Sequence, residues 1–201
     1  MFDIISIIQT VGYFGLFAII FAESGLFFGF FLPGDSLLFT AGLLASQGLL
    51  NIYFLMPLLF TAAVLGDSAG YWLGRKLGPM IFKKEDSFFF HKKHIERTRV
   101  FYAKYGAKTI IISRFVPIIR TFAPILAGVG NMEYKTFITY NIFGGAFWAI
   151  GISGLGFFLG NAIPGIEKYL HFIIALIIIV SFLPILKEFA AARKNHSAKI
   201  I

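Results

Sequence analysis

The sequence predicts an all-α membrane protein, a polytopic helical bundle in which two inverted re-entrant helix-turn segments face each other. Of the 201 residues, 58% are hydrophobic and only 14% are charged, against roughly 25% charged residues in an ordinary soluble domain. Several apolar stretches reach the roughly 20 residues that a helix needs to cross a bilayer. Two of them are interrupted by proline, and we expect the whole chain, 1–201, to form a single membrane domain.

The first re-entrant segment is predicted where a long apolar run meets a turn. Residues 4–31 are almost continuously apolar and are followed by Pro33-Gly34-Asp35, which favours a turn because proline lacks a backbone donor. Apolar sequence resumes at once, so the break is expected inside the membrane, between two half-helices. Residues 4–21 either belong to this segment or cross the bilayer separately. Asn51 is placed to cap a following span of about 52–75.

The basic residues divide the chain and predict its orientation. Lys and Arg concentrate in 75–108 and 187–199, and such clusters usually face the cytoplasm. The basic stretch 91–101 is either an amphipathic helix at the membrane interface or a solvated connecting helix. The net charge of +8 comes without a nucleic-acid recognition fold, so no nucleic-acid partner is expected. Five segments result: a first re-entrant segment plus span (10–75), a cytoplasmic basic amphipathic connector (76–108), a second re-entrant segment plus span (109–162), a last span (166–186) and a basic cytoplasmic tail (187–201).

The second half repeats the unusual features of the first. Its apolar block is broken by Pro117 and Pro124 and is followed by a glycine-rich span of about 134–161. At an offset of 86 residues, Ala41-Gly42 matches Ala127-Gly128, and a second glycine-aromatic motif recurs as well. Either an internal duplication or chance matching in a chain rich in Gly and Phe explains these pairs. If each half crosses the bilayer an odd number of times, the second copy is inverted, as in many transporters.

Five charged residues lie within or beside apolar segments. A charge at the centre of a membrane helix costs at least roughly 2.5–3.5 kcal/mol, so these residues need compensation. Three acids and two arginines offset one another only if the two halves come together. The candidate site residues are Glu23, Asp35 and Asp67 for proton coupling, and Arg114 and Arg120 for binding an anion such as phosphate.

Each assignment competes with a plainer alternative. A carboxyl removed from water, such as Glu23, can bind and release a proton, but it can also form a buried salt bridge to an arginine. Asp35 is either a partner of Glu23 or a turn residue. Asp67 is a third proton-coupling carboxyl, or it pairs with Arg75 or lies near the interface. Tyr71 and Trp72 are interpreted as interfacial anchors.

The two arginines are suited to an anion site. Arginine does not lose its proton and presents a planar fork that matches phosphate. Pro117 lies between Arg114 and Arg120, and by breaking the helix it lets both side chains point to one cavity. The alternative is that both extend to the headgroup region.

No cofactor or enzymatic chemistry is predicted. The chain has no cysteine, which excludes thiolate metal sites, and no nucleophile or phosphate-loop motif is present. The histidines show no spacing with carboxylates that argues for a metal. They are His91, His94, His171 and His196.

Four separated motifs, in order, resemble the DedA family of bacterial membrane proteins, within the VTT-domain superfamily, over roughly residues 10 to 190. The motifs are Phe21-Ala22-Glu23-Ser24, Pro33-Gly34-Asp35, the stretch 66–75 and the stretch 113–120. The resemblance implies a multi-pass protein of the bacterial cytoplasmic membrane with two facing re-entrant loops. It also implies that the functional acids fall on Glu23 and Asp35 and the functional arginines on Arg114 and Arg120.

The resemblance and the charge pattern together predict a proton-coupled transporter or flippase for an anionic lipid carrier such as undecaprenyl phosphate, supporting envelope integrity. Its expected partners are protons, an anionic polyprenyl lipid or phospholipid and the surrounding membrane lipids, and an oligomer is possible. Two alternatives remain open. One is a proton-coupled exporter of small cations or drugs, and the other is a membrane scaffold whose buried charges only determine its packing.

Overall fold

The computed structural model describes residues 4–26, 34–83, 106–115, 117–163, 165–169 and 172. Within them every regular element is a helix, as expected from the sequence. The predicted tail, most of the predicted connector and last span, and all four histidines lie outside the described residues.

The first half consists of two shorter helices and one long helix. Asn51 begins the long helix as predicted, because its side-chain oxygen accepts a hydrogen bond of 3.0 Å from the backbone N–H of Tyr53. The long helix continues past the predicted end at residue 75, since Gly74 packs closely against another helix and does not end its own. The three elements are α1 (Ile4–Gly25), which is kinked at Gly12, α2 (Gly34–Ser46) and α3 (Ile52–Lys83).

The second half has the same order of short and long elements. Pro117 is the first residue of a helix, a position where its missing N–H costs nothing, so the predicted break is present. The break predicted at Pro124 is absent, because the helix continues through this proline while packed against α3. The elements are α5 (Lys108–Ser113), α6 (Pro117–Val129), α7 (Tyr134–Gly145), the π-helical turn η2 (Ala146–Ile150), α8 (Gly151–Ala162) and the 3₁₀ turn η3 (Ile166–Tyr169).

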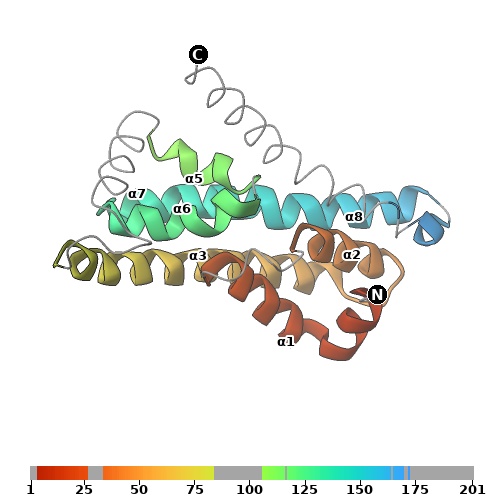
Figure 1. Cartoon of the computed structure of the whole chain (residues 1–201). Coiled ribbons are helices and arrows are strands. Elements are labelled where there is room, and N and C mark those ends of the chain that lie inside the picture. Colours follow the sequence, from red (N-terminus) through yellow and green to blue (C-terminus); the bar gives the residue numbers. More distant parts are fainter. Residues whose placement is uncertain are drawn as a thin grey trace, which may run out of the picture.

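α3 forms one long helical rod, and α7, η2 and α8 together form a second. The two rods lie side by side and run in opposite directions. Figure 1 shows that α3 begins near the end of α8 and that α7 begins near the end of α3. The short helices are exchanged between the halves: α2 packs mainly on α8, and α6 packs mainly on α3. Such a reciprocal exchange is the arrangement expected of two related halves about a pseudo-twofold axis.

Glycines allow both exchanged contacts. A side chain at Gly42 on α2 would overlap the carbonyl oxygen of Ser153 on α8, and one at Gly128 on α6 would overlap the carbonyl oxygen of Tyr71 on α3. Gly42 and Gly128 are the glycines of the repeated Ala-Gly pair, 86 residues apart. Because they have equivalent structural roles, internal duplication explains the repeat better than chance does.

The dimensions and surface of the fold match a lipid environment. Ile52–Leu77 and Tyr134–Ala162 are long and apolar enough to cross a membrane. Several large apolar side chains point outward, which would be a liability in water. These are Phe14, Tyr53, Phe143, Phe147, Phe158 and Phe172.

Candidate functional site

The five charged residues singled out in the sequence come together where the two halves meet. Glu23 lies near the end of α1, Asp35 in the first turn of α2, and Asp67 within α3. Arg114 directly follows α5, and Arg120 is in the first turn of α6. All are buried except Asp35, whose side chain is 20% exposed. The prediction that the halves bring these charges together is therefore confirmed.

Arg120 is shared by two carboxylates of the first half. Its Nη2 donates to Oε1 of Glu23, and its Nη1 donates to Oδ1 of Asp35 at 2.9 Å. Asp35 is thus more than a turn residue, since it binds a guanidinium 85 positions away. Arg120 therefore joins the end of α1 to the first turn of α2.

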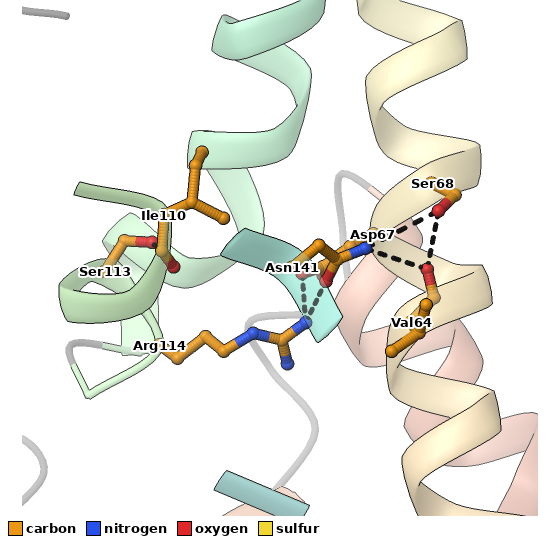
Figure 2. Close-up of polar contacts among 7 residues, drawn as sticks. All are labelled: Val64, Asp67, Ser68, Ile110, Ser113, Arg114 and Asn141. Carbon is orange, nitrogen blue, oxygen red and sulfur yellow. Dashed lines mark hydrogen bonds and ion pairs between the residues drawn. The ribbon is translucent and has the colours of Figure 1, made fainter. Parts of the chain in front are cut away.

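Arg114 occupies a second, neighbouring ion pair. Figure 2 shows its side chain reaching from the end of α5 toward Asp67 on α3 and Asn141 on α7. Its Nη2 donates to Oδ2 of Asp67 and to Oδ1 of Asn141. Asn141 in turn donates through Nδ2 to the carbonyl oxygen of Val64 at 3.1 Å and to Oγ of Ser68 at 3.5 Å. This network ties the second half to α3.

Several sequence expectations need correction. Asp67 pairs with Arg114 and not with Arg75, whose Nη1 donates to the hydroxyl of Tyr71 at 2.9 Å. Tyr71 is fully buried and donates to the carbonyl oxygen of Met132, so it is not an interfacial anchor. Neither intramembrane arginine extends toward the headgroups, because both are buried in ion pairs within the protein.

Two residues of the site were missed in the sequence. Asn141 is a fully buried amide in an apolar span, and its polarity was a signal that pointed to a partner. Trp148 donates from Nε1 to Oδ1 of Asp35 at 2.7 Å. Its ring centroid lies 4.5 Å from Cζ of Arg120 and 5.8 Å from Cζ of Arg114. No sequence pattern distinguishes this tryptophan from other aromatic residues of the span.

The arginines retain unused hydrogen-bond donors. Among the described residues, Nε and Nη1 of Arg114 and Nε of Arg120 are buried and have no hydrogen-bond partner. Oδ1 of Asp67 is likewise a buried acceptor without a hydrogen-bond partner in the described part of the chain. Leaving such groups unpaired in a low-dielectric interior costs about 1–3 kcal/mol each, or more when they are charged. The free N–H groups therefore have the chemistry of an anion site.

The charges of the cluster do not balance. Three carboxylates face two guanidiniums, so one negative charge remains when all five groups are ionised. One bound proton makes the cluster neutral, and neutrality is favoured in a buried site of low dielectric. A proton on a carboxylate also weakens its hold on an arginine.

Comparison with known proteins identifies the family. Residues 32–158 match the VTT domain, and this segment contains all the cluster's charged residues except Glu23. The chain is 45% identical over 171 residues to protein DedA of Escherichia coli (strain K12), covering 84% of this chain and 78% of that protein. The chain belongs to the DedA family. The resemblance read from the four motifs is therefore confirmed.

Two further relatives of this DedA family member are named as membrane proteins. An uncharacterized membrane protein of Mycobacterium leprae (strain TN) is 46% identical over 168 residues, 84% of this chain and 75% of the relative. The inner membrane protein YghB of Escherichia coli (strain K12) is 32% identical over 162 residues, 81% of this chain and 74% of that protein. No solved structure gives a significant match. This DedA family member is thus a membrane protein.

Proposed function

We propose that this protein is a proton-coupled transporter that carries the phosphate headgroup of an anionic lipid, such as undecaprenyl phosphate, across the bacterial cytoplasmic membrane. The observation that carries the proposal is the buried cluster, in which two arginines with unused donors are held by three carboxylates. No covalent chemistry on the lipid is proposed. Such transport would support the integrity of the cell envelope.

The lengths of the helices support a re-entrant arrangement. The Ile52–Leu77 and Tyr134–Ala162 spans have 26 and 29 residues, or about 39 and 44 Å, enough to cross about 30 Å of hydrocarbon. By contrast, α2 and α6 have 13 residues each, or about 20 Å, and are too short to cross alone. We place α1–α2 and α5–α6 as two hairpins that enter from opposite faces.

The tips of these hairpins carry the charges. Glu23 and Asp35 flank the first tip, and Arg114 and Arg120 flank the second, so the ion pairs of Arg120 join the two tips. Trp148, which contacts both arginines, lies at the centre of the 134–162 span. The cluster is accordingly placed near the midplane of the bilayer, where transporters with inverted repeats bind their substrates.

Proton exchange then couples to lipid binding. A proton on Glu23 or Asp35 weakens its ion pair with Arg120, which becomes available to the phosphate headgroup. The lipid tail stays in the bilayer while the headgroup moves through the cluster. When the headgroup is released on the other side, the carboxylate gives up its proton and its ion pair with Arg120 forms again.

Flipping of a fluorescent polyprenyl phosphate by purified protein in liposomes tests the proposal. We expect flipping that is accelerated by an imposed pH gradient and lost in Arg114→Ala and Arg120→Ala. Arg75→Ala is the matched control, because Arg75 is exposed and lies outside the cluster. A neutral polyprenol probe measures non-selective movement of lipid. Equal flipping of both probes, or full flipping without either arginine, would contradict the proposal.

The same preparation separates the alternatives. Proton-driven movement of a small cation or drug that needs Glu23 but neither arginine would identify an exporter. If the protein is a scaffold, we expect no transport. We also expect normal envelope function in cells that carry Glu23→Gln or Arg120→Lys, once insertion of the variant into the membrane is verified.

A further inference from the structure

Among the uncharged side chains of the cluster, Trp148 is the most unusual. It is 1% exposed, although its indole N–H is a polar group that needs a partner when it is buried. It also lies in the π-helical turn η2, which interrupts an otherwise α-helical rod. Such turns are rare and are frequently found at functional sites.

The indole N–H contacts the carboxylate that also binds Arg120. Oδ1 of Asp35 accepts from Nε1 of Trp148 at 2.7 Å and from Nη1 of Arg120 at 2.9 Å. Tryptophan is only a donor, and a donor binds an ionised carboxylate about twice as strongly as a neutral acceptor. The indole N–H therefore helps to hold the Asp35 carboxylate beside Arg120.

The face of the same indole holds the arginines. Its ring centroid is 4.5 Å from Cζ of Arg120 and 5.8 Å from Cζ of Arg114. Both distances are within the roughly 6 Å at which a guanidinium is attracted to an aromatic ring. One side chain thus contacts an acid through its edge and two cations through its ring. No other tryptophan is available for this role, because the only other one, Trp72, lies over Arg75 on α3.

We propose that Trp148 is a positioning residue that couples the charge of Asp35 to the placement of Arg114 and Arg120. When Asp35 takes a proton, Arg120 loses an ionic partner while the ring still holds the guanidinium in place. Arg120 then keeps its position beside Glu23, to which it is already bonded, and the donor released by Asp35 is available to an incoming phosphate. The part of this inference that concerns transport rests on the proposed function, whereas the coupling to Asp35 does not.

Fluorescence of Trp148 tests the coupling without any substrate. Trp72→Phe leaves Trp148 as the only tryptophan of the chain, so emission from this variant in liposomes reports on the cluster. We expect emission that changes with pH, because a proton on Asp35 removes the charge of the group that accepts from the indole N–H. In the described part of the chain, the charged groups that interact with the Asp35 carboxylate include Arg120 from α6 and Glu23 from α1.

Two substitutions in the Trp72→Phe background identify the group that Trp148 senses. Asp35→Asn is expected to abolish the change in emission, and Glu133→Gln, at an exposed acid on the loop before α7, is expected to leave it intact. Emission that does not depend on pH, or a pH response that survives Asp35→Asn, would overturn the coupling.

Transport variants test the positioning role. Trp148→Phe keeps the ring but removes the N–H, so we expect flipping to persist with a changed pH profile. Trp148→Leu removes the ring as well, and we expect a loss of about tenfold or more in rate, since a desolvated cation–π contact reaches about 2 kcal/mol. Trp72→Phe is the matched control and should behave as the wild type.

The outcomes separate this inference from the proposed function. A wild-type protein that flips no lipid but retains the Asp35-dependent emission change would overturn the proposed function and leave the coupling in place. Normal flipping in Trp148→Leu, with an unchanged pH profile in Trp148→Phe, would overturn the positioning role alone.

Discussion

Substituting first one partner and then both partners of the Arg114–Asp67 ion pair separates the pair's contribution to stability from its role in transport. Both side chains are buried, with exposed fractions of 1% and 2%. Asp67→Asn leaves the Arg114 guanidinium without its carboxylate, although it still donates to the amide oxygen of Asn141 and lies near the ring of Trp148. Arg114→Gln leaves an unpaired carboxylate. Each change strands one charge, which typically costs about 3–5 kcal/mol.

The double variant gives the decisive comparison. Independent effects would sum to about 6–10 kcal/mol, comparable with the whole stability of a typical domain, about 5–15 kcal/mol. Because Asp67→Asn/Arg114→Gln removes both charges and leaves two amides that can bond to each other, we expect a total cost of only about 1–3 kcal/mol. The coupling energy is then at least about 3 kcal/mol.

Equilibrium unfolding in mixed micelles measures all four species, with size-exclusion chromatography as the check on folding. A double variant as unstable as the sum of the singles would refute the ion pair as a stabilising unit. The folded double variant also tests function: we expect it to flip no polyprenyl phosphate, since the guanidinium is gone. Full flipping activity would show that Arg114 does not hold the headgroup.

Four further substitutions test packing, charge geometry and a distant hydrogen bond. Gly156→Ala on α8 should cost about 1–3 kcal/mol in thermal unfolding, because its methyl group would overlap a carbonyl oxygen of α2; Gly151→Ala, with open space on the same helix, should be neutral or stabilise by up to about 1 kcal/mol. Arg120→Lys should remain folded yet lose flipping, because an ammonium does not reproduce the fork that binds two carboxylates, and retained flipping would argue against this geometry. Tyr71→Phe should lower the free energy of unfolding by about 1 kcal/mol through the lost bond to Met132, with flipping rates unchanged.

The chemistry of single segments was predictable from the sequence. Apolar composition indicated lipid as the solvent, and Pro117 marked a real break before α6. Asn51 marked the start of α3. Pro124 was misleading, since a helix can retain an internal proline when packing against a neighbour outweighs the lost hydrogen bond.

The choice of partners was decided only by the tertiary structure. Asp67 had Arg75 two turns away on its own helix, yet it pairs with Arg114, 47 positions along the chain. The reason is that the close contacts of Gly42 and Gly128 exchange the short helices between the halves and bring the charged helix ends together.

The sequence by itself indicated that lipid surrounds the protein, that the fold is helical, where helices break and which charges need compensation. Each of these depends on local composition and on the cost of burial. The sequence did not determine that Trp148 and Asn141 complete the cluster, since nothing local distinguishes a tryptophan facing lipid from one facing two arginines. That difference depends on which helix faces meet, and only the packing of distant segments decides it.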